Sequence, residues 1–288
     1  MGWDHDDRSR FSNYHLRPAI EDGRLWSARI WSMDPLEERK MINEMSLPEK
    51  SLLFAKMAAA AYENDLPSFQ EYNATFYDRA GAQAYKFESQ TDIVIACRGT
   101  EPTEFNDIKA DLGAIPVLAE TVGRVHKGFK EEVDELWPMI KEDLQECDRT
   151  KHLWFCGHSL GAAMATIVAS RCQLDPTMHN IEALYTYGSP RVGWNKYCSS
   201  LGIRHFRWRN NNDVVTTVPP AFMGYKHHGN SCYINAYGQV RNLSGWQLTK
   251  DKLRGMWMGI KSGRIDNFSD HSITEYIHHL ENWCKEED

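Results

Sequence analysis

The sequence lacks long apolar runs and an excess of basic residues. No window approaches the roughly 18 apolar residues of a transmembrane helix, and the opening stretch, MGWDHDDRSRF, lacks the apolar segment of a signal peptide. The formal net charge is −7, whereas a nucleic-acid-binding protein needs a basic face. These absences predict a cytoplasmic protein that has no transmembrane segment and no nucleic-acid partner.

Cysteine pairs with the spacing of a redox motif or a zinc site are also missing. The seven cysteines include no CxxC pair and no zinc-ligand spacing. An odd number of cysteines in this arrangement predicts reduced, mostly buried thiols. We therefore expect neither a metal ion nor an organic cofactor.

No linker rich in proline, glycine or serine divides the 288 residues. We expect one domain over residues 46–288, a length that supplies a sizeable core. Residues 1–45 match no pattern that we can interpret, and we predict an N-terminal extension that packs on this domain. Residues 245–268 place Trp and Met beside Lys and Arg, and we expect them to pack over the core rather than to contact a membrane.

Helical and strand-like segments alternate along most of the chain. Residues 46–63 begin with a capping box and continue with apolar residues at helical spacing. Residues 92–98 form a nearly continuous apolar run, which is typical of a central buried strand. Further strand-like segments, at 181–188 and 203–210, are separated by helical or irregular stretches. This alternation predicts an α/β fold with a mainly parallel central sheet flanked by helices.

The stretch FCGHSLGAA, residues 155–163, contains the motif G-x-S-x-G. A short apolar strand precedes Gly157 and a helix follows Gly161, which is the context of a nucleophile elbow. A helix that begins at Leu160 directs unpaired N–H groups toward charge that develops beside Ser159. A chance match arises about one time in ten in such a chain, but it would rarely fall between a strand and a helix. We predict that Ser159 is a nucleophile.

A serine hydroxyl needs a base that takes its proton and an acid that orients the base. Among the downstream histidines, His271 precedes a second capping box and so lies in a loop at the mouth of a helix. We predict that His271 is the base. The alternatives, two in the final helix and two in a turn or along the cleft, are His278, His279, His227 and His228.

Asp213 is the candidate acid. It is the only carboxylate in NNNDVVTTVPP, residues 210–220, which follows a strand whose carboxyl end should lie at the same edge as Ser159. A purely structural role, as the first residue of an Asx turn, is the alternative for Asp213. In that case Asp266 or Asp270 would serve as the acid.

Several stretches, in order, resemble the class 3 lipases, the fungal-type branch of the α/β hydrolases. They extend over residues 47–282 and read ACRGTEP, VHKGF, FCGHSLGAA, LYTYGSPRVG, NNDVVTTVPP and DHSITEYI. The resemblance implies the α/β-hydrolase fold and a triad of Ser159, Asp213 and His271. It also implies an oxyanion hole formed by Thr100 and the backbone N–H of Leu160.

The resemblance further implies a lid at residues 101–122. The acidic and apolar residues of this segment suit a flap with one wet and one apolar side, although an ordinary surface loop would have a similar composition. Fungal members are typically secreted and carry disulfides, and this chain differs from them in its odd cysteine count.

The expected function is hydrolysis of carboxylic esters of lipids through an acyl-serine intermediate, with a lipid ester as substrate and a lipid–water interface as the place of action. A phospholipid acyl hydrolase or a soluble short-chain carboxylesterase on the same triad is the alternative within the same class. A lipid-binding protein that keeps the fold without turnover is the alternative from another class, and the intact triad disfavours it.

Overall fold

A computed structural model describes residues 41–63, 67, 69, 71–99, 114–175, 177–241 and 269–287. Most of the predicted N-terminal extension, all of residues 245–268 and most of the predicted lid lie outside the described residues. The boundary between residues 1–45 and the main domain therefore stays a prediction. No described helix combines the length and the apolar character that a bilayer crossing requires.

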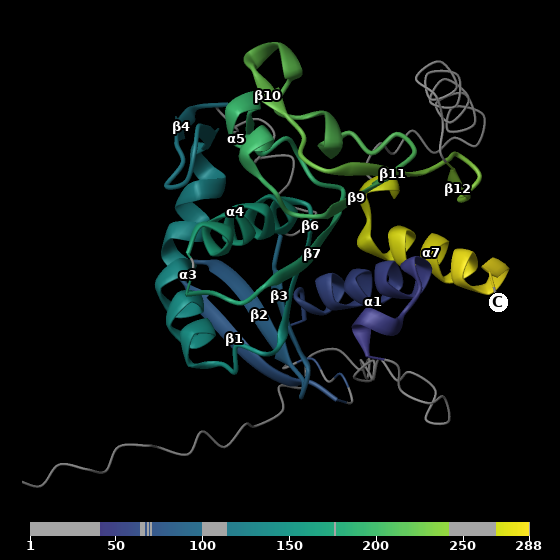
Figure 1. Cartoon of the computed structure of the whole chain (residues 1–288). Helices are drawn as coiled ribbons and strands as arrows, with labels where there is room; N and C mark the ends of the chain where they lie inside the picture. Colours follow the sequence, from purple (N-terminus) through teal and green to yellow (C-terminus); the bar gives the residue numbers. More distant parts are fainter. Residues whose placement is uncertain are drawn as a thin grey trace, which may run out of the picture. The chain divides into compact units, whose positions relative to one another are not determined.

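Within the described residues, an eight-stranded sheet forms the centre of the domain (Figure 1). Its five central strands run parallel, and antiparallel neighbours complete both edges. The predicted mainly parallel sheet is confirmed. In spatial order the strands are β1 (Asn73–Arg79), β2 (Ala82–Glu88), β3 (Asp92–Cys97), β6 (His152–His158), β7 (Ile181–Tyr187), β9 (His205–Asn210), β11 (Asn230–Ile234) and β12 (Val240–Arg241).

Helices cover both faces of this sheet, as Figure 1 shows. One face packs against α1 (Leu47–Ala60) and α7 (Ile273–Glu287), and the other packs against α3 (Lys127–Glu146) and α4 (Leu160–Leu174). Every residue of β3 is buried, as its continuous apolar sequence predicted for a strand covered on two faces. The predicted capping box of α1 is also present, because Ser46 and Glu49 each accept a bond from the other's backbone N–H.

A smaller antiparallel sheet lies beside α5 (Asn195–Ser200). Its strands, in spatial order, are β10 (Tyr225–Lys226), β8 (Gly193–Trp194), β5 (Arg124–His126) and β4 (Pro116–Leu118). The end of the predicted lid is thus a paired strand, and Lys127 N donates to Ile115 O at 2.9 Å. These backbone bonds place residues 115–118 in the small sheet, and a lid over residues 101–122 stays a prediction. The rest of the lid prediction, residues 101–113, lies outside the described residues.

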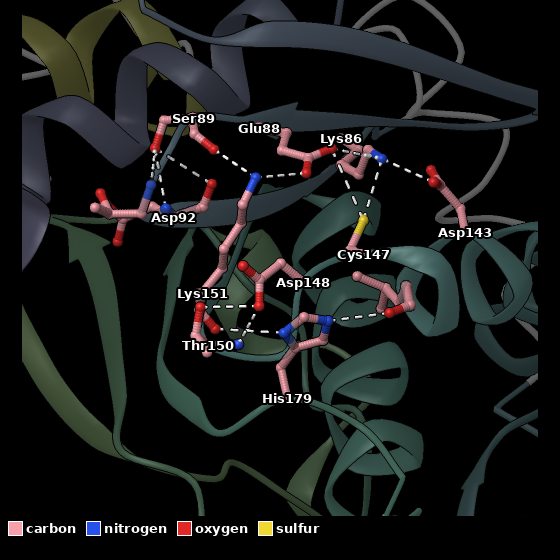
Figure 2. Close-up of polar contacts among 12 residues, drawn as sticks. Lys86, Glu88, Ser89, Asp92, Asp143, Cys147, Asp148, Thr150, Lys151 and His179 are labelled. Atoms are coloured by element: carbon pink, nitrogen blue, oxygen red, sulfur yellow. Dashed lines mark hydrogen bonds and ion pairs between the residues drawn. The ribbon is translucent and has the colours of Figure 1, made fainter.

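A polar network ties α3 to the sheet at the amino ends of β3 and β6 (Figure 2). Lys86 Nζ lies 2.8 Å from Asp143 and 2.9 Å from Glu88, while Lys151 Nζ lies 2.7 Å from Glu88. Burial alone would lower the pKa of Lys86, but the two carboxylates more than offset it and raise that pKa. This network stabilises the sheet edge remote from Ser159, which follows the carboxyl end of β6.

Candidate active site

Ser159 occupies the turn between β6 and α4, as predicted. Its backbone has φ 58° and ψ −128°, a conformation that a residue with a Cβ atom rarely adopts. Ser159 N donates to Tyr187 O of the neighbouring strand at 3.0 Å. The sheet therefore holds the strained turn in place, and the serine is fixed where the strand ends and the helix begins.

The glycines on either side of Ser159 are required by close backbone contacts. A Cβ atom at Gly157 would collide with the carbonyl oxygen of Gly161, and one at Gly161 would collide with the carbonyl oxygen of Cys97. Strand β6, helix α4 and strand β3 meet within these contacts. Only glycine therefore fits at these two positions.

The structure brings the three predicted residues together. His271 Nε2 lies 2.8 Å from Ser159 Oγ, and His271 Nδ1 lies 3.0 Å from each carboxylate oxygen of Asp213. Ser159 follows β6, Asp213 follows β9, and His271 ends the short 3-10 helix η4 (Ser269–His271) before α7. All three are buried. Residues 112 and 58 positions apart in the sequence thus form one hydrogen-bonded chain.

The hydrogen bonds also define the tautomer of His271. A carboxylate can only accept, so the Nδ1–H group donates to Asp213. Nε2 is then left with a lone pair, which accepts the Ser159 hydroxyl proton. This is the arrangement that a general base needs.

The alternative residues have other partners. The Asp270 carboxylate accepts from Asn211 Nδ2 at 2.9 Å and from Asn212 N at 3.2 Å. His227 Nε2–H donates to Thr216 O at 2.8 Å, and His228 Nε2–H donates to Leu201 O at 3.1 Å. The other two histidines lie within α7, and Asp266 lies outside the described residues.

Two further groups orient the Asp213 carboxylate. Val215 N donates to Oδ1 at 2.9 Å, which makes Asp213 the first residue of an Asx turn. Tyr276 OH donates to Oδ2 at 2.6 Å, and this hydroxyl also accepts from Asn210 N at 2.9 Å. The Asx turn and the contact with His271 therefore coexist. Burial and the Asp213 carboxylate hold the pKa of Tyr276 well above its usual value, so its hydroxyl stays a donor.

His158, directly before the nucleophile, connects the elbow to the loop that carries His271. Its Nε2–H donates to the backbone carbonyl of His271 at 2.6 Å, and its Nδ1 accepts from Tyr62 OH at 2.8 Å. Burial and the nearby His271 hold the pKa of His158 well below its usual value, so the ring is neutral. His158, Tyr62 and Tyr276 were not predicted from the sequence. The position of Tyr276 on the apolar stripe of the last helix was the only local signal.

The two predicted oxyanion donors have different outcomes. Leu160 is the first residue of α4, so its N–H has no acceptor within the helix. Thr100 lies outside the described residues. Gly99, which precedes it, is seated so tightly that a Cβ atom there would collide with Tyr62 OH and His158 O. The chain that leads to Thr100 thus passes beside the elbow, and the donor role of Thr100 stays a prediction.

Comparisons with known proteins agree with this geometry. Residues 94–223 match the family model described as Lipase (class 3). Toxin TseL of Vibrio cholerae is 23% identical over 314 residues, which cover 82% of this chain and 49% of that protein. A lipase of Rhizomucor miehei is 31% identical over 181 residues, which cover 59% of this chain and 49% of that protein. The chain thus spans about half the length of these curated relatives.

Among solved structures, lipase II from Rhizopus niveus has a TM-score of 0.56 and 25% sequence identity, and the match covers 65% of this chain and 80% of that one. The fold of the described domain is therefore that of the α/β hydrolases. The match over residues 94–223 confirms the predicted resemblance to the class 3 lipases.

Proposed function

We propose that this chain is a serine hydrolase that cleaves carboxylic esters of lipids. The continuous chain of hydrogen bonds from Asp213 through His271 to Ser159 is the observation that carries the proposal. Its position at a strained strand-to-helix turn, with a helix N-terminus beside the serine, supports acyl transfer rather than a binding role. The alternative of a binding protein without turnover gives no reason for this alignment.

In the proposed reaction, Ser159 Oγ attacks the ester carbonyl while its proton moves to His271 Nε2. Negative charge collects on the former carbonyl oxygen, where the Leu160 N–H and the positive end of the α4 dipole stabilise it. His271 then gives its proton to the leaving alcohol, and an acyl-serine remains. Water, activated by the same Nε2, releases the carboxylic acid and restores the serine.

Acylglycerols are the proposed substrates. The relatives in support are the lipase of Rhizomucor miehei and a secreted mono- and diacylglycerol lipase of Malassezia restricta, which is 28% identical over 174 residues. The structure supports action at a lipid surface through side chains at the two ends of the small sheet. Leu118 of β4 is 69% exposed, and Phe222 of the short helix η3 (Ala221–Met223), next to β10, is 91% exposed. Contact of these two exposed side chains with lipid is part of the proposal.

Hydrolysis of two esters tests this proposal: soluble p-nitrophenyl butyrate and an emulsified diacylglycerol. Wild type should hydrolyse both, and Ser159→Ala should hydrolyse neither. Activity on the short ester alone would reduce the proposal to a soluble carboxylesterase. Activity on neither ester, with a folded protein, would overturn it.

The compartment stays a prediction. All seven cysteines are free, and four of them are buried. This agrees with the predicted reduced thiols and supports our proposal of a cytoplasmic location.

A further inference from the structure

Two arginines share one face of the central sheet beside the candidate active site. Arg207 and Arg209 are alternate residues of β9, so their side chains leave the same face. Phe206 and Trp208 leave the opposite face and pack in the core that contains α1 and α7. Arg207 is only 8% exposed. Strand β9 thus has one apolar face, and its opposite face carries the buried guanidinium group of Arg207.

These guanidinium groups have no anionic partner in the part of the chain that the structure describes. Among the described residues, no carboxylate forms an ion pair with Arg207 or Arg209. Arg207 Nε, Arg209 Nε and Arg209 Nη2 are buried and lack a hydrogen-bond acceptor among these same residues. Within the described residues, the Arg209 guanidinium stacks on the ring of Tyr233 on β11, whose centroid lies 5.0 Å away. A buried cation without a partner opposes folding, because the charge loses its hydration and gains little in return.

The surrounding groups add positive charge. Arg191 clamps the loop at residues 214–220, since its Nη1 donates to Thr217 O and to Pro219 O. Burial, then Arg209 and Arg191, lower the pKa of Arg207 to about 10. Burial and Arg207 lower the pKa of His227, which holds the same loop, to about 3. His227 is therefore neutral, and the arginines carry the charge of the cluster.

We propose that Arg191, Arg207 and Arg209 form a binding site for a phosphate-class oxyanion. Guanidinium groups present paired N–H donors that match the oxygens of such an anion. Ser231, the β11 residue paired with Arg207, is exposed and adds a hydroxyl on the strand next to it. The anion would supply both the missing acceptors and the missing negative charge.

The site adjoins the candidate triad through backbone contacts. Arg209 lies in β9, and Asp213 lies four positions later, in the turn that follows this strand. Gly188 N donates to Trp208 O at 3.1 Å, and a Cβ atom at Gly188 would contact His271 and Asp213. Two sources of the anion fit this position: the phosphate of a lipid head group or free inorganic phosphate.

Binding of inorganic phosphate to the full chain tests the proposal without reference to catalysis. Isothermal titration and thermal unfolding would be measured at constant ionic strength, with chloride as the control anion. Wild type should bind phosphate, and Arg209→Gln should bind it at least about 10-fold more weakly, because it loses charge-assisted hydrogen bonds. The matched control is Arg204→Gln, since Arg204 is exposed and already lies 3.8 Å from Glu182. Absence of phosphate binding in wild type, or equal binding in Arg209→Gln, would overturn the proposal.

Arg207→Met separates an anion site from a structural arginine. Methionine keeps much of the apolar stem and removes the unpaired charge, so the melting temperature without phosphate should stay equal or rise. Added phosphate should no longer raise it. A variant that melts lower in both buffers and keeps the full phosphate response would contradict the proposal. If this variant does not fold, the Arg209→Gln comparison decides.

A pair of lipids with identical acyl chains then identifies the source. If the phosphate of a lipid head group binds at the arginines, Arg209→Gln should raise KM for phosphatidic acid and leave KM for diacylglycerol unchanged. If free phosphate is the ligand, both lipids should respond alike, and only the response to added phosphate should disappear. Phosphate binding in a chain that hydrolyses no ester would sustain the anion site while refuting the proposed hydrolase.

Discussion

Replacement of Tyr276 by phenylalanine tests how the acid of the triad is held. The change removes one hydroxyl, which donates to Asp213 Oδ2 at 2.6 Å and accepts from Asn210 N at 2.9 Å. A hydrogen bond to a charged group contributes about 1.5–3 kcal/mol. The buried Asn210 N–H is also left without an acceptor, which costs about 1–3 kcal/mol. We expect the free energy of unfolding to fall by about 2–4 kcal/mol in total, since the two terms overlap.

Catalysis should suffer less than stability. Asp213 keeps its bonds from Val215 N and from His271, so the imidazole stays in the correct tautomer. We expect kcat on p-nitrophenyl butyrate to fall by about 10-fold, which corresponds to about 1.4 kcal/mol of the activation free energy. KM should change little, because the hydroxyl does not face the substrate in the proposed mechanism.

Tyr187→Phe is the matched control. Tyr187 is also a buried tyrosine, its ring centroid lies 6.0 Å from that of Tyr276, and its hydroxyl donates to Ser51 O at 2.5 Å. The Tyr187 hydroxyl makes no bond to the triad, so its loss should lower stability and leave kcat unchanged. Urea unfolding and steady-state kinetics on both variants decide the matter. Full kcat in Tyr276→Phe, or an equal loss of kcat in Tyr187→Phe, would refute the orienting role.

The remaining predictions concern the acid, the buried histidine and the lipid surface. Asp213→Asn should lower kcat by about 10,000-fold with little change in KM, because the amide favours the wrong imidazole tautomer; full activity would move the acid role elsewhere. The pKa of His158 is depressed in the folded chain, so the unfolded chain takes up a proton that the folded chain refuses below the usual value of about 6.5. Stability is therefore lost as pH falls through that value, and His158→Gln should reduce the slope by up to about 1.4 kcal/mol per pH unit in urea titrations; an unchanged slope would contradict a neutral His158. Leu118→Asp should weaken hydrolysis of emulsified diacylglycerol and spare p-nitrophenyl butyrate, and equal effects on both esters would exclude a lipid-contacting role.

Features fixed by local sequence were predictable. The elbow follows from a strand, two glycines and a helix in direct succession, and the contacts of Gly157 and Gly161 show why no side chain fits there. The meeting of Ser159, Asp213 and His271 was also predictable. Ser159 and Asp213 each follow a parallel strand, whose carboxyl ends share one edge of the sheet, and His271 lies in the loop before the last helix.

Features that depend on tertiary contacts were not predictable in the same way. The bond from Tyr62 to His158 joins residues 96 positions apart, and neither residue has a local signature of that contact. Apolar residues in 115–118 were interpreted as part of a flap, and nothing in their local sequence indicated that they pair with β5. The arginine cluster was not predicted. The alternation of residues along β9 indicates which side chains share a face of the sheet, but it does not indicate which charged groups from other segments lie near that face.

Covalent labelling of Ser159 by a fluorophosphonate tests the central claim most directly. After digestion, mass spectrometry should find the adduct on Ser159 in wild type and no adduct in Ser159→Ala. His271→Ala should slow labelling strongly, and the double variant should hydrolyse p-nitrophenyl butyrate little worse than either single one, because the triad acts as a unit. An unlabelled Ser159 in a folded wild-type chain, or hydrolysis by Ser159→Ala above about 1% of wild type, would contradict the assignment of Ser159 as the nucleophile.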